Sequence, residues 1–590
     1  MSMKRKNLEM IRKLMFRLLP IQILLAVVDS VNNIVSSFFA SNFIGVDAMS
    51  AVGLYGPADM LLGALSAMMV GGTAVISGKY LGQNQIGKVK EVFSLNMFIT
   101  FCIGAFFTIA FVFMGVTGLT GFFTNDPTLK PIFSRFLLGM SIGILPMILA
   151  NQLPAFLTME NNSKRTMIAS ITYIVVNVVL NFLFVNVMKM QEFGLALATS
   201  LGMWSFFLVE AQHFVSKKSN FKFSFKGINF KEAISIVTTG FPGAAGNIYM
   251  TIRGLIVNKL LEIHVGSVGL SAFAAANNLL MVFWAIPAGM MAVSRLLISV
   301  SMGEEDRQTL TDIMRVMFTY YIPMICMIDA LLIIGAPLLT SIFFQDTASE
   351  VFSLTAEALR ILPLCMPFSI ICMHFTAYGQ ASEKKAFVNI LSLLDGVLDV
   401  ALFSLLLTST FKVNGVCMAN VINGIITTLF IVGYSCFKNR YFPKNIDELM
   451  VIDDNFGVPY ENRIDISVNS IDEVVNLSQR IIDFCKEKGI DDRRAFFCGL
   501  ALEEMAGNIV EHGFTKDKKK HSINVRFSHK DDQIILRIKD DCIPFNPEER
   551  IRMSENDDVT KNIGIKMIYR MFKDIDYQYL LGMNVLTIKL

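Results

Sequence analysis

The sequence contains few charged residues for a chain of 590: only 17% are Asp, Glu, Lys or Arg, whereas 53% are hydrophobic. Such a composition excludes an ordinary soluble protein as the first interpretation and favours a membrane protein. The formal net charge of +3 is small and spread along the chain, so no basic patch for nucleic acid is visible. We therefore expect the lipid bilayer, and no nucleic acid, among its partners.

Several familiar motifs are also missing. The nine cysteines never form a Cys-x-x-Cys pair, which excludes that type of zinc site, and their scatter suggests no disulfide framework. No P-loop sequence occurs, so ATP-driven pumping of the cassette kind is not supported. No small-residue cleavage site follows the basic start "MSMKRKNLEMIRKLMFRLL", so we expect the first apolar run to remain as a membrane span.

Apolar segments that are long enough to cross a bilayer recur up to residue 437. A span needs about 20 mostly apolar residues to cross roughly 30 Å of hydrocarbon. On this criterion the sequence predicts about twelve spans. They lie near residues 14–40, 48–72, 93–115, 133–158, 165–188, 193–215, 232–261, 268–300, 310–343, 353–378, 385–410 and 414–437.

Basic residues are distributed unevenly between the loops. The intervening loops carry only Lys130, Lys189 and Lys412. The alternate loops and both tails of the membrane part carry Lys4, Arg5, Lys6, Lys79, Lys88, Lys90, Lys164, Arg165, the cluster at 217–231, Arg307, Lys384, Lys385, Lys438 and Arg440. By the positive-inside rule, we expect a multi-pass protein of the cytoplasmic membrane with both termini in the cytoplasm.

The membrane part repeats itself. The segment "FIGVDAMSAVGL" (43–54) is similar to "HVGSVGLSAFAA" (264–275). One offset of 221 residues relates Gly45 to Gly266, Gly82 to Gly303 and Gly194 to Gly415. We therefore predict two six-helix lobes in parallel topology, with a substrate path between them near the midplane. The lobes are assigned to residues 1–215 and 232–437, joined by a basic cytoplasmic loop at 216–231.

These repeats resemble the multidrug and toxic compound extrusion (MATE) transporters over roughly residues 8–440. The resemblance is carried by "LLP...VVDSVNN...IGVDAMSAVGL", "GGTAVISGKYLGQNQ", "VVNVVLNFLF" and "FGLALATSLG". Members of that family export organic cations and other small molecules against an inflow of sodium ions or protons. The resemblance therefore implies a cation-coupled antiporter for small organic molecules.

Polar residues within the first lobe are candidates for binding the coupling ion. A carboxylate at membrane depth costs about 2.5 to 3.5 kcal/mol on insertion scales, so Asp29, midway along the first span, should face a partner or a wet cavity. Asn177 and Asn181 present their amide oxygens on one helix face, and Thr199 could add a hydroxyl. By similarity, the family's site has an Asp where this chain has Asn181, which makes the site less negative. Structural hydrogen bonding between helices is the alternative role.

The second lobe contains a rival group. Asp395 and Asp399 lie on one face of the eleventh predicted span, and Arg253 lies in the seventh. Two acids near a buried arginine could form a coupling site. A structural network that neutralises these charges explains the same residues.

The character of the chain changes after Phe437. Residues 438–462 are polar and punctuated by Pro443, Gly457 and Pro459, which is typical of a linker. From residue 463 to 590 the sequence alternates between amphipathic helices and short strands, such as "RIDISVN" and "QIILRIKDD". The fold class is therefore an all-α polytopic membrane protein followed by a cytoplasmic α+β sandwich.

The helix "ALEEMAGNIVEHGF" carries Glu504, Asn508 and His512 at intervals of four residues. Each interval turns a helix by about 400°, so the three side chains form one narrow stripe. An acid that positions or deprotonates water, an amide oxygen for magnesium and an imidazole near phosphate make chemical sense together. A solvated polar face is the alternative interpretation.

This stripe and two later motifs, "IKDDCIPFNPEE" and "NIGIKMIYRMFKDIDYQYLLGMNVLTIKL", resemble the histidine-kinase-like ATPase fold of anti-sigma-factor serine kinases. The resemblance implies a site for ATP and Mg²⁺. In it Glu504 is the general base, Asn508 the magnesium ligand, Asp540 the acceptor for the adenine amino group, Gly564 the phosphate-lid glycine and Thr587 the hydroxyl behind the adenine.

The chain departs from the family pattern in places where glycine lets the backbone approach phosphate. Cys542 replaces the glycine after the adenine-binding Asp, and Asn562 and Ile563 replace the paired lid glycines. These departures weaken the case for nucleotide binding.

We expect, in total, an exporter driven by H⁺ or Na⁺ and fused to a domain that senses nucleotide or docks a regulatory protein at residues 463–590. Two other functions are open. The domain could be an anti-sigma-like serine kinase with the spans as its sensor, or the membrane part could flip lipid-linked saccharide. The single Arg253 argues against the flippase, because that substrate favours a basic central cavity.

Overall fold

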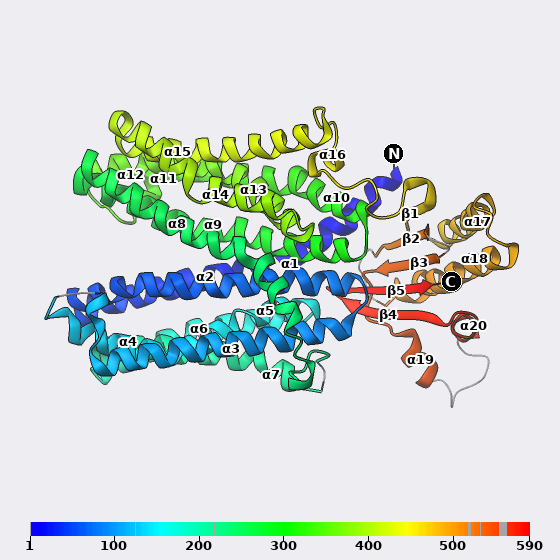
Figure 1. Ribbon diagram of the computed structural model, residues 1–590, viewed down its shortest axis with the longest axis horizontal. Coiled ribbons are helices and arrows are strands. Elements are labelled where there is room, and N and C mark those ends of the chain that lie inside the picture. The colour runs from blue at the N-terminus through cyan, green and yellow to red at the C-terminus, as the bar shows by residue number, and fades with distance from the viewer. Residues whose placement is uncertain are drawn as a thin grey trace.

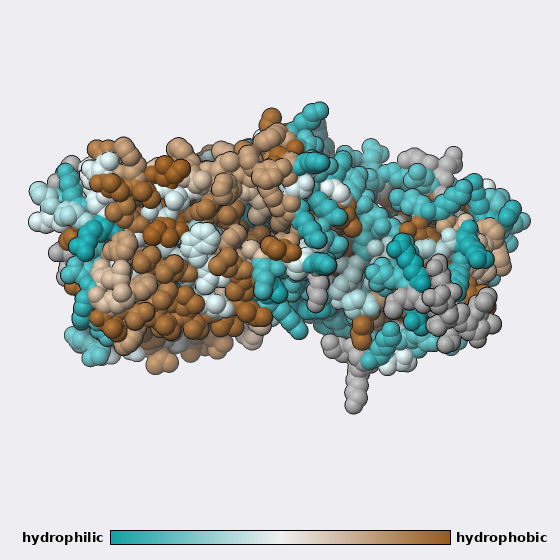
Figure 2. Space-filling model, turned by 90° about the horizontal axis from the view of Figure 1, so that it is seen from below, coloured by the Kyte–Doolittle hydropathy of each residue, from teal (hydrophilic) through white to brown (hydrophobic). Residues whose placement is uncertain are grey.

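The computed structural model describes residues 2–123, 126–217, 219–516, 521–530, 533–553 and 563–589. It consists of an elongated helical bundle with a smaller domain of helices and strands at one end (Figure 1). The bundle comprises residues 2–439, and the C-terminal domain comprises residues 463–589. Figure 2 shows hydrophobic side chains gathered over the bundle and hydrophilic ones over the domain.

The first half of the bundle, lobe one, occupies the lower part of Figure 1. Its helices are α1 (Ser2–Phe39), α2 (Val46–Gly82), α3 (Ile86–Thr117), α4 (Leu129–Ala150), α5 (Leu153–Met159), α6 (Ser163–Asn181) and α7 (Gln191–Val215). Only a short turn separates α4 from α5, so the two form one predicted span. A π-helical segment, Phe182–Val187, extends α6.

The second half, lobe two, occupies the upper part of the same view. Its helices are α8 (Lys231–His264), α9 (Gly266–Gly303), α10 (Arg307–Val316), α11 (Ile322–Thr340), α12 (Glu350–Ile361), α13 (Met366–Ala381), α14 (Lys385–Leu393) and α15 (Asp399–Asn439). The long helix α15 is interrupted at Lys412, whose φ of 53° and ψ of −129° are not helical.

The helices can be matched to the twelve predicted spans, although fewer of the described stretches are both long and apolar enough to cross a membrane. Among the described residues, nine helical stretches are long and apolar enough to cross a membrane. The last of them, Lys385–Asn439, contains the break at Lys412 and therefore accounts for two predicted spans. The two remaining predicted spans coincide with α1 and α8, which are long enough, at 38 and 34 residues, but are not among those nine stretches.

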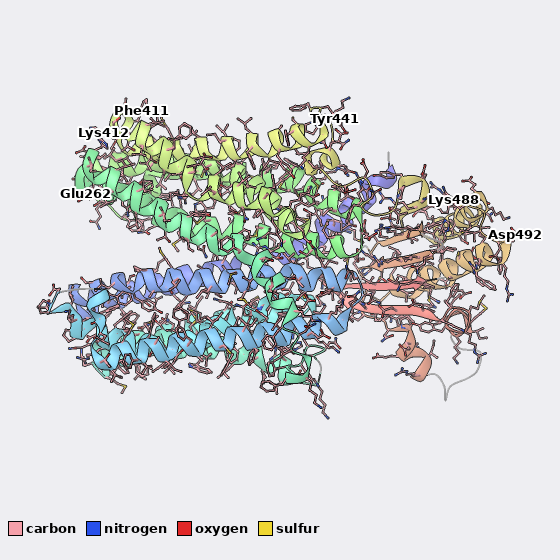
Figure 3. The ribbon with its side chains drawn as sticks, in the orientation of Figure 1. Glu262, Phe411, Lys412, Tyr441, Lys488 and Asp492 are labelled. Carbon is pink, nitrogen blue, oxygen red and sulfur yellow. The ribbon has the colours of Figure 1, made fainter. Side chains whose placement is uncertain are left out.

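The two lobes make close backbone contact near the domain. Figure 3 places Glu262 and Lys412 at the end remote from the domain, the far end, and Tyr441 at the near end. In the near half, a Cβ on Gly72 would lie 2.0 Å from the carbonyl oxygen of Ile236 in lobe two. In the far half of α2, a Cβ on Gly63 would meet no described atom within 4 Å beyond its own helix. The lobes therefore meet backbone to backbone near the domain, and Figure 1 shows the ribbons of α8 and α2 separating toward the far end.

A five-stranded antiparallel sheet forms the centre of the C-terminal domain, with strand order β1-β2-β3-β5-β4. It lies between the bundle and the helices α17, α18 and α20 (Figure 1). The strands are β1 (Arg463–Val468), β2 (Ile523–Lys530), β3 (Gln533–Asp540), β4 (Asp574–Leu580) and β5 (Met583–Lys589). The helices are α17 (Ile471–Glu487), α18 (Asp492–Asn508), α19 (Pro547–Met553) and α20 (Ile563–Met571).

Alternation along β3 gives its two faces different neighbours. Leu536 and Ile538 are almost fully buried in the core that the sheet shares with the helices. Arg537 and Lys539 point the other way, toward lobe two, where Lys539 pairs with Glu304. The sheet is thus covered on both faces, by its own helices and by the bundle.

The polar linker is docked on lobe two and contains the short helix α16 (Ile446–Met450). Lys384 donates hydrogen bonds to the carbonyl oxygens of Met450 at 2.8 Å and Val451 at 2.6 Å. Arg307 pairs with Asp447 at 2.9 Å. These contacts attach the linker, which leads into the C-terminal domain, to lobe two.

Replacing Gly72 with alanine tests the contact between the lobes. The added methyl group would collide with the backbone of Ile236, so we expect a loss of about 1–3 kcal/mol in unfolding free energy. The matched control is Gly63→Ala on the same helix, which has room and gains up to about 1 kcal/mol in helix propensity. Thermal unfolding of the purified proteins in detergent measures both. Equal midpoints for the two variants would contradict this account.

Candidate functional site

A cavity of about 830 Å³ lies in the C-terminal domain between α18, the start of α20 and the ends of β3 and β5. Its volume is in the range usual for small-molecule sites. Five of the residues proposed from sequence line it: Glu504, Asn508, His512, Asp540 and Gly564. The structure therefore brings together residues that lie up to 60 positions apart in the sequence.

Helix α18 supplies three of these side chains. It begins after Asp491, whose carboxylate accepts a hydrogen bond from the backbone N–H of Arg494 at 3.0 Å and so caps the helix. Its apolar side packs on the sheet, and the polar stripe is left facing the cavity. The Nδ2 group of Asn508 donates to the carbonyl oxygen of Glu504 at 2.6 Å. This bond uses the donor side of the amide, so Oδ1 is the atom that can bind a cation.

Asp540 forms the floor of the cavity and is only 3% exposed. Its Oδ1 accepts hydrogen bonds from Asn584 Nδ2 at 2.7 Å and from the backbone N–H of Cys542 at 3.0 Å. Burial raises the pKa of this carboxyl group above its ordinary value. The hydroxyl of Tyr577 in turn donates to Asn584 Oδ1 at 2.6 Å. Asp540 is thus held in one orientation by its neighbours.

The proposed position of Thr587 requires a correction. Thr587 is opposite Arg537 in the sheet register and accepts a hydrogen bond from its Nε at 3.2 Å. It therefore lies on the face toward the bundle and does not line the cavity. Asn584 lies beside Asp540 instead. The signal was present in the sequence, because Asn584 alternates with Leu586 and Ile588, which belong to the buried core face.

Gly564 lies where any side chain would collide with Glu504, the candidate general base. A Cβ at this position would lie 1.7 Å from Glu504 Oε2, so glycine allows the start of α20 to approach α18. Ile563 also lines the cavity, whereas Asn562 lies outside the described residues. Ile563 and Cys542 stand where the resemblance to the ATPase fold would place glycines. Both line the cavity, and each adds bulk to its wall.

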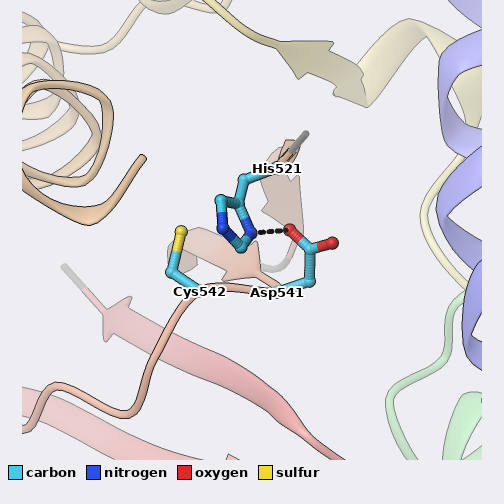
Figure 4. Close-up of side chains that lie close together, drawn as sticks. All are labelled: His521, Asp541 and Cys542. Atoms are coloured by element: carbon cyan, nitrogen blue, oxygen red, sulfur yellow. Dashed lines mark hydrogen bonds and ion pairs between the residues drawn. The ribbon is translucent and has the colours of Figure 1, made fainter. Parts of the chain in front are cut away.

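His521, Asp541 and Cys542 form a cluster beside this cavity (Figure 4). Their ligand atoms lie within 4.8 Å of one another, and these residue types can hold a metal ion. Asp541 Oδ1 already contacts His521 Nδ1 at 3.1 Å and accepts from the backbone N–H of Ser522 at 3.0 Å. These bonds tie the start of β2 to the end of β3, which is sufficient to explain the cluster.

In lobe one, three of the four residues proposed for cation coupling form a connected chain. Asn181 Nδ2 donates to Asn177 Oδ1 at 2.6 Å, and both side chains are fully buried. Asn177 Nδ2 lies 3.5 Å from Thr199 Oγ1, which lies 3.4 Å from Ser36 Oγ on α1. The fourth residue, Asp29, is two helical turns before Ser36, and its side chain lies outside the described residues.

This chain borders a cavity of about 380 Å³ inside lobe one. Thr199 and Ser36 line it, together with Asn32 and Asp59, which the sequence analysis did not select. Asp59 could have been found, because it is an acid within a predicted span. Among the described residues, Asn181 Oδ1 is buried and has no hydrogen-bond donor. A buried acceptor without a donor is costly unless a water molecule or ion satisfies it.

The acids of lobe two are arranged differently from the expected ion-pair network. Arg253 donates to the backbone carbonyl of Asp395 at 3.5 Å, while the Asp395 carboxylate accepts from Asn423 at 3.0 Å. Asp399 Oδ2 is buried without a partner among the described residues. Asp329 on α11, another acid that the sequence analysis missed, is 4% exposed and has neither oxygen bonded within the described part. Its position within the apolar run "CMIDALL" was the available signal.

Comparisons with known proteins match both parts of the chain. The MatE family model matches residues 20–183 and 242–405, and the model of the histidine kinase-like ATPase domain matches residues 469–590. A probable multidrug resistance protein NorM from Bacillus licheniformis is 25% identical over 187 residues. That match covers 29% of this chain and 41% of the relative.

Solved structures resemble the bundle. An outward-facing conformation of a multidrug resistance MATE family transporter has a TM-score of 0.68 and 19% identity, covering 75% of this chain and 97% of that one. A transporter of the MOP superfamily from Pyrococcus furiosus, described as having a binding pocket of reverse polarity, has a TM-score of 0.65 and 19% identity. It covers 72% of this chain and 97% of its own length. At this identity the likeness establishes the fold.

Proposed function

Because the chain belongs to the MatE family, we propose that it exports small organic molecules in exchange for protons or sodium ions. The observation that carries the proposal is the buried polar chain from Asn181 through Thr199 to Ser36 at the wall of the lobe-one cavity. Oxygen atoms of this kind suit a hard cation, and a carboxylate can carry a proton. We propose that the near end faces the cytoplasm, because the positive-inside rule puts the basic loops there.

Neutralising Asp29 tests the coupling site. We expect Asp29→Asn to lower ion-driven export at least tenfold, because the amide keeps the shape of the side chain but can neither carry a proton nor balance a cation. The matched control is Asp346→Asn, which removes an exposed acid outside the predicted spans. Export by proteoliposomes under a proton or a sodium gradient measures the effect. Unchanged export in Asp29→Asn would contradict the proposed site.

Adding a carboxylate should separate the two ions. Asn181→Asp makes the site more negative, so we expect the sodium concentration needed for half-maximal export to fall in this variant. A protein driven by protons alone would show no sodium dependence before or after the change. The same proteoliposomes, with sodium varied at constant pH, give the measurement.

We also propose that the C-terminal domain binds an adenine nucleotide with Mg²⁺. The residues present fit this ligand: Asp540 offers a buried acceptor for an exocyclic amino group, and Asn508 Oδ1 is available to a cation. When bound, ATP would supply a transferable phosphoryl group. Glu504 would then orient or deprotonate the attacking group, and His512 would lie near the phosphates. Phosphoryl transfer to a partner protein is the second candidate function, and loss of that transfer in Glu504→Ala would support it.

The pair Asn584 and Thr587 gives a sharp test of the nucleotide site. Asn584→Leu removes the hydrogen bond that orients Asp540, so we expect the dissociation constant for Mg-ATP to rise at least tenfold. Thr587→Val changes a residue on the opposite face of the sheet and should leave binding within twofold. Titration calorimetry of the full-length protein measures both. Absence of saturable binding by the unmodified protein would refute the nucleotide proposal.

A further inference from the structure

On the face of the sheet that points toward the bundle, four basic side chains pair with lobe two: Arg526, Lys530, Arg537 and Lys539. They meet the acidic turn Glu304–Asp306 between α9 and α10 of lobe two.

The distances in this contact are short. Lys539 Nζ lies 2.5 Å from Glu304 Oε2, and Lys530 Nζ lies 2.8 Å from Glu305 Oε2. Arg526 donates to the carbonyl oxygen of Glu305 at 2.9 Å and lies 3.3 Å from Asp306 Oδ1. Together with the docked linker, these ion pairs hold the domain on lobe two.

The same domain also reaches lobe one, through the turn between β4 and β5. Asn161 donates to the hydroxyl of Tyr579 at 2.9 Å, and Arg17 donates to the carbonyl oxygen of Gly582 at 3.3 Å. Leu581 is 2% exposed and belongs to the hydrophobic cluster of the bundle. The contacts with lobe one are therefore two buried apolar side chains, Leu581 and Met583, and a few neutral or single-charge hydrogen bonds. The hydrogen bonds among these contacts are weaker than the charge-assisted bonds of the ion pairs with lobe two.

The domain covers the place where the two lobes close on each other. A Cβ on Gly303 would lie 2.0 Å from the carbonyl oxygen of Lys79, so α9 and α2 meet backbone to backbone there. Lys79 also pairs with Glu383 of lobe two at 2.6 Å. The turn Glu304–Asp306, which forms the ion pairs with the domain, directly follows Gly303. Any separation of the lobes at the near end would move this turn away from Asn161 of lobe one.

We propose that the C-terminal domain stays attached to lobe two and holds the near end of the transporter closed by bridging to lobe one through Leu581. Opening toward the cytoplasm then requires the β4–β5 turn to leave lobe one. This inference rests on the proposed export cycle, in which the lobes rock against each other to give alternating access. It assigns the ATPase-like domain the role of a releasable bridge.

A first experiment measures lobe separation without using export. Spin labels are attached at Lys90→Cys in lobe one and Lys385→Cys in lobe two, both exposed, in full-length protein whose exposed cysteines Cys102 and Cys326 are serine. The test variant, Leu581→Asp, places a charge in the bridge; we expect it to add a longer-distance population.

Leu581 has a φ of +55°, which Asp tolerates well, so the turn itself should keep its shape. The control is Val475→Asp, at a half-exposed apolar residue of α17 on the outer side of the domain. It should give the distances of the parent protein. An unchanged distribution in Leu581→Asp would overturn the bridge. Because the readout is a distance, failure of export would refute the antiporter proposal and leave this test standing.

A second experiment compares two tethers in the same cysteine-reduced background. Asn161→Cys with Tyr579→Cys joins the domain to lobe one, and Glu305→Cys with Lys530→Cys joins it to lobe two, each through a short, reducible bis-thiosulfonate linker. We expect the tether to lobe one to lower export at least tenfold until reductant is added, and the tether to lobe two to leave export within twofold. Full export with the lobe-one tether in place would overturn the proposal.

Discussion

The buried charges at the turn Glu304–Asp306 are the constraint on which the union of transporter and domain depends. The side chains of Glu304 and Asp306 are 7% and 5% exposed, and burying a carboxylate costs several kcal/mol unless it is paired and hydrogen-bonded. Although burial opposes ionisation, the charges of Arg526 and Lys539 hold the pKa of Asp306 well below its ordinary value. Asp306 also accepts a hydrogen bond from the backbone N–H of Thr309 and so caps α10. The same residue therefore stabilises the start of this helix and binds the domain.

This contact explains why the sheet of the C-terminal domain does not carry helices on both faces. Arg526, Arg537 and Lys539 would give a sheet surface suited to water if the domain were isolated. Here the bundle covers that surface, and the side chain of Arg526 is 7% exposed because lobe two supplies acidic partners for its guanidinium. The domain is thus a continuation of lobe two, reinforced by the linker contacts of Lys384 and Arg307.

Sequence reasoning predicted the architecture well, because hydropathy and the offset of 221 residues determine spans and repeats without reference to side-chain contacts. The stripe of Glu504, Asn508 and His512 was also found, since helical spacing is a local property. The prediction for Thr587 was wrong about the face of the sheet on which the residue lies. Neighbouring residues of a strand point to opposite faces, so an error of one position changes the face. The sequence analysis did not select the basic residues of β2 and β3, because no local pattern shows that Glu304, more than 200 positions earlier, covers them.

The geometry of β3 connects the two surfaces of the domain. Asp540 forms the floor of the cavity, and the adjacent Lys539 forms an ion pair with Glu304 on the opposite face of the sheet. Successive residues of a strand point to opposite sides, so these two adjacent residues serve the cavity on one face and the contact with lobe two on the other. Asn584 extends this relation, because it binds Asp540 and lies two residues after Gly582, whose carbonyl oxygen contacts Arg17 of lobe one. The cavity is therefore lined by residues of β3 and β5, the two neighbouring strands next to which both attachments of the proposed bridge lie.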